Sequence, residues 1–140
     1  MDETVHVRYM VSDVAQAVAF YTSHLGFEVE TNFAPAFASV QRGHLRLLLA
    51  GPQSSAGRPM SDGAVPGPGG WNRIHFVVPD VSAEVARLKA EGCEFRNDPI
   101  SGPGGSQALL LDPSGNVVEL FQTGGPGVRG LLQFAARAIR

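Results

Sequence analysis

The sequence predicts an α+β fold built from two βαβββ modules in tandem, which form a curved, cupped mixed sheet with helices on the outside. The first observation is a repeat, because a β-rich run, an aspartate, a helical stripe and a glycine occur twice. Asp13 and Asp80 are 67 residues apart, and Gly26 and Gly92 are 66 apart. The second observation is a stretch rich in glycine, proline and serine, residues 51–70, between the copies. Such spacing indicates two structural units of the same kind.

Each copy predicts the same order of elements. In the first copy residues 5–11 are β-rich, and residues 13–26 have the cap, the period and the final glycine of an amphipathic helix. Residues 73–78 and 80–92 repeat this pattern. Two more strand-like runs around a turn follow in each copy, and DPSGN at 112–116 is a strong hairpin signal. The apolar stripes of the two helices are Val14, Val18, Tyr21 and Leu25, and Val81, Val85 and Leu88.

These boundaries predict one domain over residues 1–123. Its first module spans 4–50, its linker 51–70 and its second module 71–123. Residues 124–140 form a C-terminal tail, in which arginines border an apolar stripe. The stripe predicts a short amphipathic helix that docks on the domain or on a second subunit, because a helix of this length is marginal alone.

The composition argues against several classes of protein. The net charge is −2 and no block of like charge is present, so no nucleic-acid partner is expected. The first residues lack the basic and apolar regions of a signal peptide, and no apolar run approaches the roughly 18 residues of a membrane span. The single cysteine, Cys93, is interpreted as a small buried hydrophobe in a reducing compartment. We therefore expect a cytoplasmic protein without a membrane partner.

Strand alternation predicts that polar side chains collect on one face of each sheet. Residues two apart in a strand point the same way, so the strand WNRIHFVVPD directs Arg73 and His75 to the same side. Two modules can bury their sheets together, and this face is then predicted to line a cavity between them. The side chains expected there are His6, Arg8, Met10, Leu47, Arg73, His75, Glu119 and Phe121.

The run HVRYMVSDVAQAVAFYTSHLGFEV, together with DPSGNVVELFQ, resembles the vicinal oxygen chelate superfamily. That group includes glyoxalase I, extradiol dioxygenases, fosfomycin-resistance thiol transferases and bleomycin-resistance proteins, and the resemblance covers residues 5–122. It implies a homodimer and, in the metal-dependent members, metal ligands on the first and last strand of each module. His6 and Glu119 fall on two of these ligand positions. Arg73 and Leu47 fall on the other two, where neither residue is a metal ligand.

The preferred interpretation is a small-molecule-binding protein that uses no metal, such as one that sequesters an antibiotic or a metabolite. Arg8 and Arg73 would bind the anionic part of a mostly apolar ligand. Met10, Leu47 and Phe121 would supply apolar walls. A simpler alternative is that Arg73 and Glu119 form only an internal ion pair.

The resemblance also implies an enzyme of a second class. This would be a lyase, isomerase or dioxygenase of the lactoylglutathione lyase kind, with one divalent metal ion (Zn, Ni, Fe or Mn). His6 and Glu119 would hold the metal, with His75 as a third ligand two residues beyond Arg73, and Glu119 and His75 would be the catalytic residues. A third alternative is a catalyst without metal, in which His6 or His75 acts as the base beside Glu119.

Overall fold

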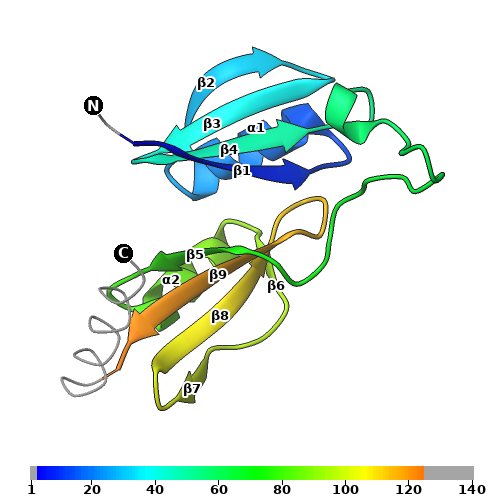
Figure 1. Ribbon diagram of the computed structural model, residues 1–140. Coiled ribbons are helices and arrows are strands. Elements are labelled where there is room, and N and C mark those ends of the chain that lie inside the picture. Colours follow the sequence, from blue (N-terminus) through cyan, green and yellow to red (C-terminus); the bar gives the residue numbers. More distant parts are fainter. Residues whose placement is uncertain (1–2, 125–140) are drawn as a thin grey trace. The chain divides into compact units, whose positions relative to one another are not determined.

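The computed structural model describes residues 3–124 of the chain (Figure 1). The chain divides into two compact units, one of residues 1–71 with 112–116, and one of residues 72–111 with 117–140. We call them unit 1 and unit 2. The helix expected in the C-terminal tail lies outside the described residues. No helix within 3–124 is long and apolar enough to cross a membrane.

Unit 1 is a four-stranded mixed sheet with one helix on it. The strand order is β1-β4-β3-β2, with β1 parallel to β4 and the other neighbours antiparallel. A 3₁₀ turn, η1, follows the last strand. The elements are β1 (Val5–Met10), α1 (Val14–His24), β2 (Glu28–Phe33), β3 (Phe37–Arg42), β4 (Leu45–Ala50) and η1 (Ser55–Gly57).

Unit 2 repeats this arrangement with one difference. Its strand order is β5-β9-β8-β6, with β5 parallel to β9, and a further short strand, β7, also pairs with β8. The place that β2 takes in unit 1 is therefore shared by two short strands, β6 and β7. The elements are β5 (Ile74–Val77), α2 (Val81–Ala90), β6 (Glu94–Phe95), β7 (Ile100–Gly102), β8 (Gly105–Leu111) and β9 (Val117–Thr123). The predicted α+β fold with two βαβββ modules is confirmed.

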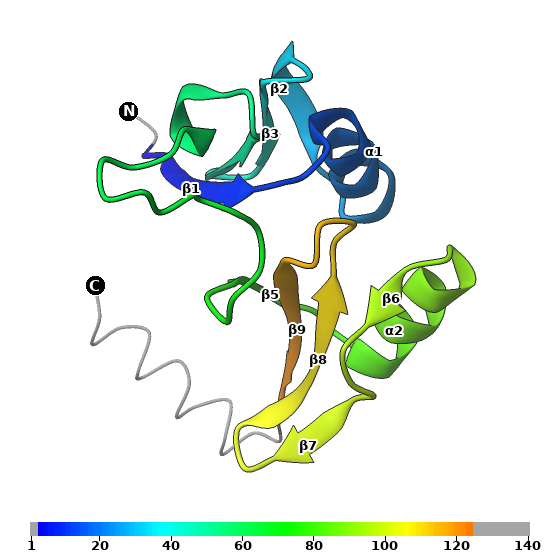
Figure 2. The same ribbon diagram turned by 90° about the vertical axis from the view of Figure 1, so that its right-hand side faces the viewer.

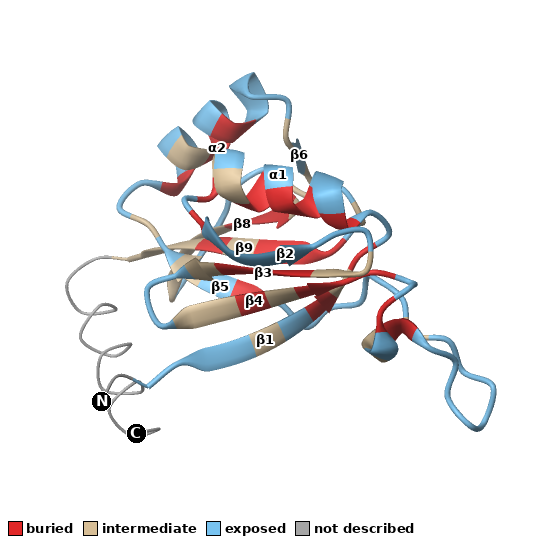
Figure 3. Cartoon of the chain, turned by 90° about the horizontal axis from the view of Figure 1, so that it is seen from above, coloured by how far each residue is buried: buried red, intermediate tan, exposed pale blue. Residues whose placement is uncertain are grey.

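Both helices begin where the sequence predicts. Asp13 accepts a hydrogen bond from Gln16 N at 3.0 Å, and Asp80 accepts one from Ala83 N at 3.0 Å, so each aspartate satisfies a free amide of the first turn. Each predicted apolar stripe is buried, and the buried residues lie on the inner side of each helix and along the strands (Figure 3). Cys93 is only partly buried, and burial raises the pKa of its thiol.

Each helix covers one face of the sheet in its own unit (Figure 2). Among the described residues no α-helix covers the opposite face, which we call the open face of unit 1 or of unit 2. Since side chains alternate along a strand, every second residue of β1, β4, β5 and β9 belongs to an open face. The candidate binding residues are taken from these two faces.

The turn between β8 and β9, residues 112–116, belongs to unit 1. The buried carboxylate of Asp112 accepts a hydrogen bond of 2.8 Å from the hydroxyl of Tyr21 in α1. The side-chain amide of Asn116 donates to the carbonyl of Met10 at 2.8 Å, at the end of β1. Burial, and next the Asp112 carboxylate, raise the pKa of Tyr21 well above its usual value, so the hydroxyl stays a donor. These bonds hold the turn against the β1–α1 junction.

Candidate functional site

The open face of unit 2 carries a compact charged cluster. Arg73, directly before β5, donates from Nε to Glu119 Oε1 on β9 at 2.8 Å. The two side chains are 28% and 14% exposed, so the ion pair is largely withdrawn from water. His75 Nε2 lies 4.0 Å from the other carboxylate oxygen, Oε2. The ring of His75 meets Phe121 edge-on, with the ring centroids 5.1 Å apart.

The register of two parallel strands places these side chains together. His75 lies opposite Glu119, and Val77 lies opposite Phe121. Ile74 and Phe76 alternate with them on the helix-covered face, which the burial of Ile74 reflects. Strand alternation predicts Arg73, His75, Glu119 and Phe121 on one face, and the structure brings these four side chains together.

The open face of unit 1 carries His6, Arg8 and Met10, as the alternation predicts. These residues lie opposite Arg46, Leu48 and Ala50 of β4. The ring nitrogen Nε2 of His6 is 3.1 Å from the hydroxyl of Thr4, at hydrogen-bond distance. His6 and Arg8 are exposed and Met10 is half-buried, so all three side chains are accessible on this face.

The expectation that Leu47 lies on the open face is wrong. Leu47 is fully buried, and its neighbours across the sheet are Val7 and Val40, which lie on the face that α1 covers. The residue that stands opposite Arg8, as Glu119 stands opposite His75, is Leu48.

The error comes from the register between the first and the last strand of each module. Leu45 and Val117, the first paired residues of β4 and β9, each lie two residues after the glycine of their turn. Val7, however, pairs with Leu47, which lies four residues after its glycine, whereas the equivalent Ile74 pairs with Val118, only three residues after its own. Counting from the glycine therefore differs by one residue from the pairing with the first strand. A shift of one residue in a strand moves a side chain to the opposite face.

A second ion pair, on the open face of unit 1, was not predicted from the sequence. Arg46 Nε donates to Glu30 Oε2 at 2.8 Å, and the hydroxyl of Ser39 donates to Glu30 Oε1 at 2.9 Å. The bond from Ser39, and then the guanidinium of Arg46, lower the pKa of Glu30. Glu30 sits where the register between β2 and β3 shifts, so simple alternation along β2 could not place its side chain.

The residues of unit 2 do not form a set that fits a divalent metal ion. One oxygen of Glu119 is bound by Arg73, whose guanidinium is a permanent positive charge at the place where a cation would bind. His75 and Glu119 supply only two donors, whereas zinc, nickel, iron and manganese sites use three or more protein ligands. Within each unit taken by itself, no three His, Cys, Asp or Glu side chains of the described residues are grouped closely enough to bind a metal.

A family model described as the Glyoxalase/Bleomycin resistance protein/Dioxygenase superfamily matches residues 4–120. A comparison with curated proteins finds no significant match. Among solved structures, a superfamily member from Sphaerobacter thermophilus DSM 20745 is 26% identical with a TM-score of 0.69, covering 87% of this chain and 98% of that one.

Two other solved structures have names that state a function. TnmS3, an antibiotic binding protein from Streptomyces sp. CB03234, is 25% identical with a TM-score of 0.65, covering 89% of this chain and 98% of that one. A lactoylglutathione lyase from Agrobacterium tumefaciens is 23% identical with a TM-score of 0.69, covering 87% and 94%. The second likeness concerns the fold alone. The fold thus occurs both in a binding protein and in an enzyme.

Proposed function

Because the chain belongs to the glyoxalase/bleomycin resistance protein/dioxygenase superfamily, we propose that it is a small-molecule-binding protein. Its ligand is mostly apolar and partly anionic, and it binds at the open faces without a metal ion. The likeness to the antibiotic binding protein TnmS3 supports this class of function. The superfamily also contains enzymes, so the proposal rests on the residues of the open faces rather than on the fold.

The observation that carries the proposal is the 2.8 Å bond between Arg73 and Glu119. In a metal-dependent relative this carboxylate would bind the cation. Here an arginine neutralises it, and the arginine stands at a position where the resemblance expects a histidine ligand. A metal ion could bind Glu119 only by displacing the guanidinium of Arg73, and breaking this ion pair would be costly. The ion pair therefore supports a binding surface in place of a metal centre.

Apolar side chains beside the charged groups fit the rest of such a ligand. On the open face of unit 2, Phe121 is partly exposed and Val77 is 66% exposed. On the open face of unit 1, Met10 and Leu48 are partly exposed. Apolar walls with a few polar groups are typical of small-molecule sites.

An acid–base catalyst without metal is a second candidate function, favoured by one observation. His75 Nε2 and Glu119 Oε2 are 4.0 Å apart, so a small movement would let the carboxylate orient the imidazole as a base. The bond from Arg73 to the same carboxylate weakens its ability to stabilise a protonated imidazole. Binding therefore remains the preferred proposal.

The superfamily resemblance further supports a homodimer, and the composition supports a cytoplasmic location. Exposed apolar side chains are available for a contact between copies, among them Val5 at 60% and Phe33 at 69% exposure. Light scattering on the full chain at several concentrations tests the dimer directly.

Metal analysis, activity assays and calorimetry on the same preparation test the proposed function. The full chain is purified without added metal or chelator, and we expect metal well below one equivalent. We expect no turnover of the methylglyoxal–glutathione hemithioacetal or of catechol after addition of Zn, Ni, Fe or Mn. Calorimetry with a panel of aromatic antibiotics that carry a carboxylate or phenolate is expected to detect binding. Stoichiometric metal that is lost in His75→Ala would overturn the proposal.

A further inference from the structure

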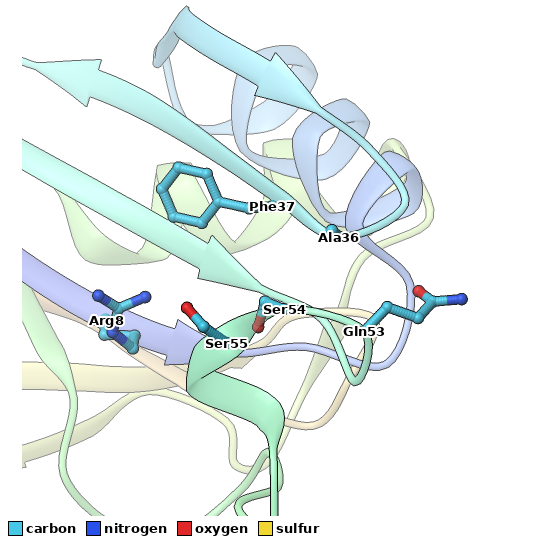
Figure 4. Close-up of a pocket in the computed structure, with 6 residues that line it drawn as sticks. All are labelled: Arg8, Ala36, Phe37, Gln53, Ser54 and Ser55. Carbon is cyan, nitrogen blue, oxygen red and sulfur yellow. The ribbon is translucent and has the colours of Figure 1, made fainter.

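Unit 1 contains a pocket of about 420 Å³ beside the end of β1. It is formed where the loop after β4 passes the start of β3 (Figure 4). A volume of this size is within the range of small-molecule sites, roughly 300–1,000 Å³. We call it the Arg8 pocket. Its lining residues are Arg8, Ala36, Phe37, Gln53, Ser54 and Ser55.

The charge of the Arg8 pocket is positive, because its lining includes one arginine and no acidic residue. Within residues 3–124, the side chain of Arg8 makes no hydrogen bond or ion pair with another described residue. Other arginines do so with a carboxylate or a backbone carbonyl. They are Arg42, Arg46, Arg58, Arg73 and Arg87.

The difference between Arg8 and Arg73 has a simple structural cause. Arg73 is bound to Glu119 of the neighbouring strand, whereas the residue opposite Arg8 on β4 is Leu48. An aliphatic neighbour provides no acceptor, so all five N–H donors of Arg8 stay available to a ligand. A guanidinium of this kind binds carboxylates through paired hydrogen bonds.

Hydrogen bonds and close packing hold the loop beside Arg8, which includes Ser54 and Gly57, in its conformation. Ser54 Oγ donates to Gly51 O at 2.7 Å and accepts from Gly57 N at 3.1 Å. Gly57 is packed so closely that a Cβ there would lie 2.5 Å from Gly51 O. Ser55 is therefore presented by a rigid turn, which lowers the entropy that a ligand must overcome to order it.

Polar and aromatic side chains of the Arg8 pocket lie on one side of it. Figure 4 shows the hydroxyl of Ser55 directed toward the side where the guanidinium of Arg8 lies. The ring of Phe37 lies on that same side, while the amide of Gln53 points away from it. Phe37 is partly exposed, so one part of its ring can contact a ligand.

We propose that the Arg8 pocket binds an aromatic carboxylate. The carboxylate accepts hydrogen bonds from the guanidinium of Arg8 and the hydroxyl of Ser55, and the ring of the ligand packs on Phe37. The inference rests on the proposed function, since it specifies where the anionic part of the ligand binds. It assigns that part to Arg8 and not to Arg73, whose Nε is bound to Glu119.

The probe for the test is 2-naphthoate, titrated into the full chain and followed by calorimetry and by amide chemical shifts. The neutral 2-naphthamide and the small anion acetate are titrated in parallel. We expect 2-naphthoate to shift the amides of Phe37 and Ser55 and to bind about tenfold or more tightly than either control, because charge-assisted hydrogen bonds and ring contact act together.

Three variants locate the site. Arg8→Gln is expected to weaken 2-naphthoate binding about tenfold, and Leu48→Glu to do the same by giving Arg8 an internal partner. The matched control is Arg46→Gln, which removes the same charge from the same open face. It is expected to leave binding within about twofold, since Arg46 is paired with Glu30 and does not line the Arg8 pocket. Thermal melts of each variant check that the fold is retained.

The inference is overturned if wild-type protein does not bind 2-naphthoate, or if Arg8→Gln and Arg46→Gln weaken it equally. It is also overturned if the shifted amides lie around Arg73 and Glu119 in unit 2. These outcomes are separate from a failure of the proposed function, which is decided by metal content, turnover and the antibiotic panel. A protein that binds those antibiotics with unchanged affinity in Arg8→Gln keeps its proposed function and loses this site.

Discussion

The two open faces are built by the same elements and differ in how their arginines are bound. In unit 2, Arg73 is paired with Glu119, and His75 stands next to the same carboxylate. In unit 1, Arg8 faces Leu48. One residue on the last strand of each module therefore decides whether an arginine in the first strand, or directly before it, is neutralised or available. The difference indicates that the charges are paired on the open face of unit 2, whereas the open face of unit 1 has a cationic pocket.

The hairpin turns of the two modules differ as well. The turn between β3 and β4 has two residues, whereas the turn at 112–116 has five and belongs to unit 1. Besides Tyr21, the carboxylate of Asp112 accepts hydrogen bonds from the backbone amides of Ser114 and Asn116, both at 2.9 Å. The longer turn thus has a structural role that the shorter one lacks.

The largest effect is expected for Asp112→Ala. The change leaves the Tyr21 hydroxyl and two backbone amides without their acceptor in a buried place, so we expect a loss of about 3 kcal/mol in the free energy of unfolding. Urea unfolding of the full chain measures it. Tyr21→Phe removes one bond only and should cost about 1–2 kcal/mol. Equal losses in the two variants would show that the turn is held by other contacts.

A smaller loss of stability is expected when Glu119 of unit 2 is replaced by leucine, the residue at the equivalent position of unit 1. Glu119→Leu places leucine opposite His75, as Leu48 stands opposite Arg8, and it removes the acceptor of Arg73. Because the two side chains keep 28% and 14% of their exposure, we expect a loss of about 1–2 kcal/mol in the free energy of unfolding.

Binding of 2-naphthoate distinguishes the faces in this variant. Glu119→Leu should create a new weak site whose shifted amides lie near Arg73, while the site at Arg8 keeps its affinity. The conservative control Glu119→Gln retains an acceptor and should lose less stability. If anion binding near Arg73 is the same in Glu119→Leu as in the wild type, the ion pair with Glu119 is not what prevents Arg73 from binding anions.

The smallest effects are expected at the two helix caps, where the modules are alike. Asp13→Ala and Asp80→Ala each remove one exposed cap bond of 3.0 Å, and each should cost about 1 kcal/mol. Thermal and urea melts of the two variants measure the losses under one set of conditions. A clear inequality would show that the modules differ in stability at positions where their local structure is the same.

Local signals in the sequence were sufficient to predict the repeat, the helices and the direction of most strand residues. Caps, apolar stripes and the glycine after each helix act over a few residues, and period-two alternation follows from the geometry of a strand. These signals correctly placed Arg73, His75, Glu119 and Phe121 on one face. The split of the second strand of unit 2 into β6 and β7 had no comparable signal.

The partners that face one another across strands depend on contacts between distant segments, which no local signal specifies. Register depends on the pairing of these segments, and a difference of one residue between the two modules places Leu47 in the core and Leu48 beside Arg8. The ion pair of Glu30 follows from a register shift, and the Arg8 pocket from a loop folded back on β3. The sequence thus specifies which side chains lie on the open faces. Long-range pairing of strands specifies which of them already have a partner within the protein and which can bind a ligand.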